Sequence, residues 1–194
     1  MSSRPIRAAL AVALAAAATL PAIAAEPFSR TVFFGDSLTD SGYFRPVIVA
    51  SPVGAAGAIL GRFTTNPGLT WAEHVADRYG TSAYANGNGQ VGDNYAAGGA
   101  RVSATAITAL GQAPSLASQV NTYLTANGGR ADANALYTVW GGANDLFAVA
   151  AAPAQAQQII GSAVTAQVGL VGTLQAAGAR YVVVPSIPDI GLTP

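Results

Sequence analysis

Short uninterrupted runs of apolar residues are the main feature of the hydrophobic pattern. Three of these runs, residues 31–34, 135–140 and 180–185, have the length of strands and are rich in β-branched and aromatic residues. They do not alternate between apolar and polar positions, which is typical of strands that are buried on both faces of a parallel sheet. The pattern therefore predicts a mostly parallel sheet with helices on both sides.

Helical periodicity occupies segments between these strands. Residues 69–79 form a short amphipathic pattern that begins with the spacing of a capping box. Residues 115–126 form a second helical pattern, and residues 154–177 form the longest one, with apolar residues at steps of three and four. Residues 44–67 are rich in Gly, Ala, Pro and Thr, so we expect a long loop with one helical turn at most. This order of elements predicts one α/β domain.

Polar and glycine-rich residues form three clusters near the ends of strands. Residues 35–37 (Gly-Asp-Ser) follow the first strand, and residues 142–145 (Gly-Ala-Asn-Asp) follow the second. Residues 98–99 (Gly-Gly) come after a turn-rich loop between these two strands. In open α/β sheets the ligand crevice lies outside the carboxyl ends of the strands. We therefore expect the three clusters to meet at one site.

Ser37 stands where the first strand stops and a helix could begin, which is a good position for a nucleophile. A serine hydroxyl attacks after a base takes its proton, and a helix N-terminus would add free N–H groups and partial positive charge. The same residues also suit a plainer role, because Asp36 and Ser37 are common helix-capping types. From the Gly-Asp-Ser-Leu tetrapeptide alone both interpretations stay open.

Gly99 and Asn144 favour the nucleophile over the helix-cap interpretation of Ser37. Acyl transfer needs hydrogen-bond donors aimed at the negative charge that develops on the tetrahedral intermediate. The N–H groups of Ser37 and Gly99 and the side-chain amide of Asn144 could supply them. Each residue also has an ordinary role, since a Gly-Gly pair suits a tight turn and Asn144 suits a helix cap. Their combination at these strand ends favours a serine nucleophile with oxyanion donors.

The composition excludes several other functions. The 194 residues include nine basic residues, all of them Arg, and nine acidic ones, so charge gives no argument for nucleic acid or an anionic membrane as a partner. The absence of cysteine excludes disulfides, thiolate metal sites and a cysteine nucleophile, and a single histidine, His74, excludes a His-rich metal site. Hydrophobic residues make up 51% and charged residues 9%, which fits a folded domain with one core.

Residues 1–25 have the pattern of a signal peptide. Arg4 and Arg7 form a positive start, residues 8–20 are an apolar stretch dominated by Ala, and small residues suited to cleavage follow. A transmembrane anchor is the alternative, but the apolar stretch is shorter than the ~20 residues that a span needs. We expect export from the cytoplasm, with the mature domain over residues 26–194.

On these motifs the chain resembles the GDSL esterase/lipase family, also called SGNH hydrolases. Residues 35–42 (Gly-Asp-Ser-Leu-Thr-Asp-Ser-Gly) match the first sequence block of that family, residues 94–100 match the second, and residues 142–145 match the third. Residues 188–194 resemble a further family segment, and the likeness covers nearly all of residues 31–194. Within the family, the match is nearest to the autotransporter-type esterases of Gram-negative bacteria.

The resemblance implies a flavodoxin-like, three-layer α/β/α sandwich and hydrolysis of carboxylic esters through an acyl-enzyme on Ser37. It also implies an oxyanion hole made of the N–H groups of Ser37 and Gly99 and the amide of Asn144, with no cofactor or metal. The substrate would be a small-molecule or lipid ester, met in the periplasm, at the outer-membrane surface or outside the cell. A C-terminal outer-membrane β-barrel is implied for the full-length parent.

The sequence departs from the family pattern at the catalytic base. The family supplies the base from an Asp-x-x-His block, which these 194 residues do not contain. We therefore expect residues 26–194 to be a hydrolase domain that is incomplete at its C-terminus and weak or inactive by itself. His74 does not replace the base, because it falls on a predicted helix as a surface or half-buried residue, and Asp189 belongs to a loop.

The sequence leaves two alternatives to ester hydrolysis open. A non-catalytic remnant of the same fold that binds lipid or glycan is the main alternative. A nucleotide-binding module of flavodoxin type has less support, because no Gly-x-Gly-x-x-Gly or Gly-Lys-Ser/Thr loop follows a strand.

Overall fold

The computed structural model describes residues 27–52, 61–64 and 68–192. The predicted signal peptide, residues 1–25, lies outside these residues, and so does part of the predicted loop over residues 44–67. The strands and all three polar clusters lie inside them.

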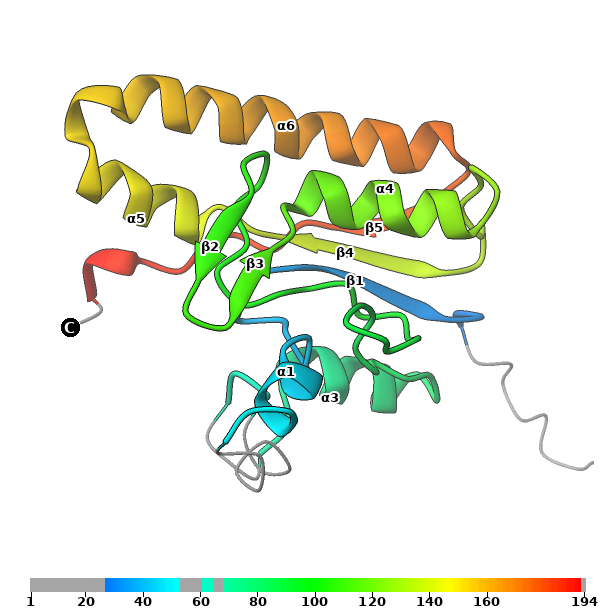
Figure 1. Cartoon of the computed structure of the whole chain (residues 1–194). Helices are drawn as coiled ribbons and strands as arrows, with labels where there is room; N and C mark the ends of the chain where they lie inside the picture. Colours follow the sequence, from blue (N-terminus) through cyan, green and yellow to red (C-terminus); the bar gives the residue numbers. More distant parts are fainter. Residues whose placement is uncertain (1–26, 53–60, 65–67, 193–194) are drawn as a thin grey trace, which may run out of the picture.

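A parallel three-stranded sheet forms the centre of the structure (Figure 1). Its strands are β1 (Thr31–Gly35), β4 (Leu136–Trp140) and β5 (Tyr181–Val183), in the order β1-β4-β5. The last residues of β1 and β4, Gly35 and Trp140, pair with each other. Both strands therefore end at the same edge of the sheet, and the polar clusters that follow them start there.

Helices cover both faces of this sheet. Helices α4 (Leu116–Ala126) and α6 (Ala156–Ala176) lie on one face, while α3 (Trp71–Arg78) and the short α1 (Arg45–Val49) lie on the other (Figure 1). The prediction of an α/β sandwich with a mostly parallel sheet is confirmed.

The capping box predicted for α3 is present. The hydroxyl of Thr70 accepts a hydrogen bond from the N–H of Glu73 at 3.4 Å, and the carboxylate of Glu73 accepts one from the N–H of Thr70 at 2.9 Å. The two bonds satisfy N–H groups that a helix N-terminus otherwise leaves unpaired, which explains why α3 begins at Trp71.

Several short elements were not predicted. They are the antiparallel hairpin of β2 (Ala106–Thr108) and β3 (Gly111–Ala113), helix α5 (Ala143–Ala151), and the 3₁₀ turns η1 (Pro153–Gln155) and η2 (Ile190–Leu192). Strands of three residues are too short to show an alternating pattern. Helix α5 is dominated by small and apolar residues, so it lacks the contrast between faces on which helix prediction depends.

The larger core lies between the sheet and helices α4 and α6. Phe34, Tyr123 and Tyr137 form its aromatic centre, and Tyr123 meets each of the other two rings edge to face. The hydroxyls of Tyr123 and Tyr137 share a hydrogen bond of 2.8 Å, so neither polar group is buried without a partner. Leu174 of α6 is fully buried in the same core. A smaller core packs Phe33 against α3 on the opposite face.

Helix α6 leaves much of its apolar surface exposed. Leu170 and Leu174 are buried, whereas Val164 and Val168 are 57% and 68% exposed. The stretch Pro153–Ala176 is long and apolar enough to cross a membrane by length and composition alone. Core helices pass the same test, so this feature by itself assigns no location.

Replacing Leu174 by Ala should lower the free energy of unfolding by about 2–5 kcal/mol, because the change removes a fully buried side chain and leaves a cavity under α6. The matched control is Val168→Ala on the same helix, which should change it by less than about 0.5 kcal/mol because Val168 is largely exposed. Urea unfolding followed by circular dichroism measures both values. Equal effects of the two substitutions would contradict the packing of α6 against the sheet.

Candidate active site

The turn after β1 carries Ser37. The carbonyl of Asp36 accepts hydrogen bonds from the N–H groups of Thr39 and Asp40, both at 3.0 Å, which closes one tight turn. Gly35 makes the turn possible, because a Cβ there would lie 2.8 Å from Oγ1 of Thr39. Ser37 is half-buried at this turn, and its hydroxyl makes no hydrogen bond within the described part of the chain.

No helix begins at Ser37, although the sequence allowed one there. The first helix, α1, starts at Arg45. The carboxylate of Asp40 accepts hydrogen bonds from the N–H groups of Gly42 and Tyr43, both at 2.7 Å, and Gly42 has a φ of 140°, which no helix allows. The helix-capping interpretation of Ser37 is therefore wrong.

The carboxylate of Asp40 also ties this turn to the second cluster. Its Oδ2 accepts a hydrogen bond from the N–H of Gly98 at 2.7 Å. Burial raises the pKa of Asp40 to about 6, against the opposing effect of the N–H donors, so the group is mostly ionised at neutral pH. Asp40 thus fixes Gly98, and the Gly99 that follows it, relative to Ser37.

Gly98 and Gly99 form a turn whose backbone favours glycine at position 99. A Cβ on Gly98 would lie 2.2 Å from the ring of Phe63, and Gly99 has a φ of 83°. The predicted tight turn is therefore present. The N–H groups of Gly99 and Ser37 donate no hydrogen bond to any residue that the structure describes.

Asn144 and Asp145 lie in the first turn of α5. Neither caps the helix, so the helix-cap interpretation is wrong here as well. Asn144 Nδ2 instead donates to the carbonyl of Ala100 at 2.9 Å. The buried carboxylate of Asp145 accepts from the N–H of Val102 at 2.9 Å and from Arg101 Nε at 3.1 Å. These bonds join the third cluster to the second, and they leave one hydrogen of the Asn144 amide available.

The two other residues considered for catalysis lie elsewhere on the surface. His74 is an exposed residue of α3, as predicted. Asp189 is exposed too, and its carboxylate accepts a hydrogen bond from the N–H of Gly191 at 2.9 Å. Neither side chain forms a hydrogen bond with Ser37. Within the described residues there is also no cluster of three or more His, Asp or Glu side chains that could hold a metal ion.

Sequence reasoning missed Gln119. Its buried side-chain amide pairs with both the N–H and the carbonyl of Gly35, each at 2.9 Å. The available signal was a polar residue within the apolar face of α4, where Leu116, Val120 and Tyr123 are also buried.

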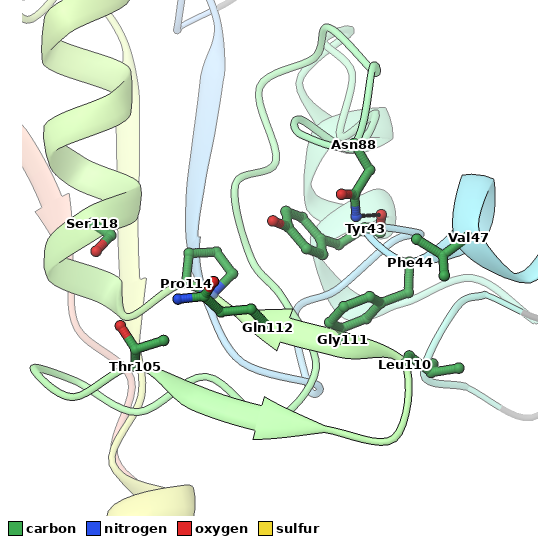
Figure 2. A pocket seen from close by; sticks show the side chains of 10 residues that line it. All are labelled: Tyr43, Phe44, Val47, Asn88, Thr105, Leu110, Gly111, Gln112, Pro114 and Ser118. Atoms are coloured by element: carbon green, nitrogen blue, oxygen red, sulfur yellow. Dashed lines mark hydrogen bonds between the residues drawn. The ribbon is translucent and has the colours of Figure 1, made fainter.

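A cavity of about 450 Å³ lies between the β2–β3 hairpin, the start of α4 and the segment that leads into α1 (Figure 2). Aromatic rings and polar side chains both line it, among them Tyr43, Phe44, Asn88 and Gln112. Ser37 is not among the lining residues, and neither are Gly99 and Asn144.

Comparison with known proteins identifies the family. The family model of GDSL-like lipases/acylhydrolases matches residues 31–194. The chain is 35% identical over 170 residues to Lipase 1 of Photorhabdus luminescens, covering 88% of this chain and 24% of that protein. It is 34% identical over 227 residues to esterase EstA of Pseudomonas aeruginosa, covering 100% of this chain and 33% of that protein. The chain belongs to the GDSL lipase/acylhydrolase family, and it spans about a quarter to a third of the length of these relatives. The family resemblance noted in the sequence is confirmed.

The Asp36→Asn variant tests the electrostatics of the turn. Asp36 is only 3% exposed, and burial, assisted by the nearby charge of Asp145, raises its pKa to about 6. Because this folded-state pKa lies above the unfolded value, the stabilising contribution of Asp36 is present at pH 4 and is lost as the pH rises through 6. The variant should therefore gain stability relative to the unmodified chain, by up to about 3 kcal/mol between pH 4 and pH 7.

Urea unfolding at intervals of pH measures this difference. The control is Asp77→Asn, which changes an exposed carboxylate of α3 and should show no such trend. A stability difference between the Asp36→Asn variant and the unmodified chain that stays constant from pH 4 to pH 7 would rule out a raised pKa for Asp36.

Proposed function

We propose that the chain hydrolyses carboxylic esters through a serine acyl-enzyme, with Ser37 as the nucleophile. Membership of the GDSL lipase/acylhydrolase family supports this class of reaction. Ser37 Oγ attacks the carbonyl carbon of a small-molecule or lipid ester, the alcohol leaves with a proton, and water then releases the acid and restores Ser37. The proposed reaction uses no cofactor.

The unpaired backbone donors carry this proposal. Between residues 96 and 100, the N–H groups of Ala96, Ala97, Gly98 and Ala100 all donate hydrogen bonds, and only that of Gly99 does not. The N–H of Ser37 is also unpaired. Donors left open in the loops that follow β1 and carry Gly99, one of them on Ser37 itself, favour a role in binding an oxyanion.

The three donors act together in the proposed step. As the carbonyl carbon becomes tetrahedral, its oxygen gains negative charge, which the N–H groups of Ser37 and Gly99 and the amide of Asn144 would stabilise. The bond from Asn144 Nδ2 to the carbonyl of Ala100 fixes the plane of the amide. Little reorganisation is then needed when the charge appears, because all three donors are held by the surrounding backbone.

The proton of the Ser37 hydroxyl requires a base. Among the residues described, no side chain accepts a hydrogen bond from Ser37, and His74 is exposed on α3. We therefore propose that this chain supplies the nucleophile and the oxyanion donors and is weak or inactive by itself. Export through residues 1–25, and an outer-membrane β-barrel in the full-length parent, stay predictions.

A non-catalytic binding role is the second candidate, and the 450 Å³ cavity favours it. Aromatic rings such as Tyr43 and Phe44 offer surfaces for acyl chains or sugar rings, and the amides of Asn88 and Gln112 offer hydrogen bonds. Because Ser37 does not line this cavity, ligand binding there would be unaffected by substitution of Ser37. Binding without turnover, equal in the chain and in Ser37→Ala, would favour this candidate.

Added imidazole should reveal the nucleophile. If Ser37 lacks only a base, imidazole should raise p-nitrophenyl butyrate hydrolysis by the chain at least about tenfold above the rate of the Ser37→Ala variant. The variant in the same buffer corrects for direct hydrolysis by imidazole. The control Ser162→Ala, an exposed serine of α6, should behave like the unmodified chain. Identical rates in the chain and Ser37→Ala at every imidazole concentration would exclude catalysis by Ser37.

Substitution of Asn144 should slow the same reaction. Asn144→Ala removes one proposed oxyanion donor, so the imidazole-dependent maximal rate should fall by about 10²–10³-fold. The matched control is Asn121→Ala, which alters an exposed asparagine on α4 and should leave the rate unchanged. Circular dichroism checks that both variants fold. A maximal rate that is unchanged in folded Asn144→Ala would exclude Asn144 from the oxyanion hole.

A further inference from the structure

Gln119 holds the last residue of β1 by two hydrogen bonds. Oε1 accepts the N–H of Gly35 and Nε2 donates to the carbonyl of Gly35, both at 2.9 Å. Nε2 also donates to the carbonyl of Pro114 at 3.0 Å, so both of its hydrogens are used. The side chain is 2% exposed. Because an N–H faces Oε1 and a carbonyl faces Nε2, the amide has one satisfactory orientation.

The bond from the N–H of Gly35 interrupts a series of backbone hydrogen bonds along β1. Along this edge of β1, the N–H of Phe33 donates to the carbonyl of Asp93 at 2.9 Å, and the N–H of Tyr95 donates to the carbonyl of Phe33 at 2.8 Å. The next N–H on the edge is that of Gly35, and it donates to Gln119 rather than to the neighbouring segment. Gln119 thus takes the place of the neighbouring segment as the acceptor for the N–H of Gly35.

The same carbonyl of Gly35 joins two clusters of the candidate site. It accepts the N–H of Ala97 at 3.2 Å in addition to Nε2 of Gln119. Ala97 comes two residues before Gly99, and Gly35 comes two residues before Ser37. A displacement of Gly35 would therefore shift the nucleophile and one oxyanion donor relative to each other.

We propose that Gln119 is a positioning residue for the ester hydrolysis, one that sets the distance between Ser37 and the N–H of Gly99 through the backbone of Gly35. The inference rests on the proposed function of Ser37. Small errors in the placement of reacting groups lower rates strongly even when binding is unaffected. Loss of Gln119 should thus reduce the reactivity of Ser37 more than the affinity for a substrate.

Diethyl p-nitrophenyl phosphate is a suitable probe of Ser37. Attack by Ser37 Oγ on phosphorus forms a serine–phosphorus bond and releases p-nitrophenolate, while the serine proton passes to imidazole in the buffer. Absorbance follows the p-nitrophenolate, and intact mass counts the diethylphosphoryl groups. Gln119→Met, which keeps the length and loses both hydrogen bonds, should lower the maximal rate by about 10–100-fold. The half-saturating probe concentration should stay within about twofold, because no contact to the probe is removed.

Two further variants make the test specific. Gln157→Met makes the same replacement at an exposed position of α6 and should react like the unmodified chain. Gln119→Glu should depend on pH, because a neutral carboxyl can donate to the carbonyl of Gly35 and an ionised one cannot. Its rate relative to the unmodified chain should therefore rise as the pH falls from 8 to 5, with circular dichroism confirming the fold at each pH.

Each failure has a separate signature. If Ser37 of the unmodified chain does not react with the probe in imidazole, the proposed function is contradicted. The proposed role of Gln119 is then contradicted as well. A reactive chain whose Gln119→Met variant reacts equally fast overturns the role of Gln119 alone. If Gln119→Met does not fold, Gln119→Glu decides, and a relative rate that does not change with pH overturns the inference.

Discussion

The buried carboxylate of Asp40 is the interaction on which the candidate site depends. It accepts three backbone N–H groups, two from the turn that follows Ser37 and one from Gly98. These segments belong to no helix or strand. The hydrogen bonds to the carboxylate therefore hold them in place, as backbone hydrogen bonds do in regular secondary structure. Burial of the charge is unfavourable, and the three donors offset part of that penalty. Removing Asp40 would leave three N–H groups without a partner at the centre of the site.

Asp40 is one of several buried polar side chains that bind backbone groups. Asn94 donates to the carbonyl of Thr39, Gln119 pairs with Gly35, and Asp145 accepts the N–H of Val102. Each of these bonds joins segments that are far apart in the sequence. The sheet itself contributes one constraint, the pairing of Gly35 with Trp140, which starts the first and third clusters at the same edge. Buried side chains such as Asp40, Asn94, Gln119 and Asp145 then hold the adjacent loops in place.

The sequence predicts these buried polar contacts less well than it predicts the strands and helices around them. The apolar strands, the capping box of α3 and the long helix α6 follow from local patterns, and the structure contains them all. The predicted burial of β5 is wrong, because Tyr181 and Val183 are 48% and 46% exposed. The three candidate site residues, Ser37, Gly99 and Asn144, were predicted from polar clusters near strand ends and from the family motifs. Gln119 was missed because nothing local shows that a helix residue will meet Gly35, which is 84 positions away. The absent helix at Ser37 has the same origin, since the contact of Asp40 with Gly98 spans 58 positions.

The buried carboxylates of these loops pair some backbone N–H groups and leave others open. The carboxylates of Asp36, Asp40 and Asp145 accept the N–H groups of Leu38, Gly42, Tyr43, Gly98 and Val102. Other N–H groups inside the same loops, among them those of Ser37, Ser41 and Gly99, have no partner among the residues that the structure describes. An unpaired N–H costs about 1–3 kcal/mol when it is shielded from water, but Ser37 and Gly99 are both only half-buried. Donors without a protein partner are available to a negative charge that develops during a reaction, which is what the proposed roles of Ser37 and Gly99 require.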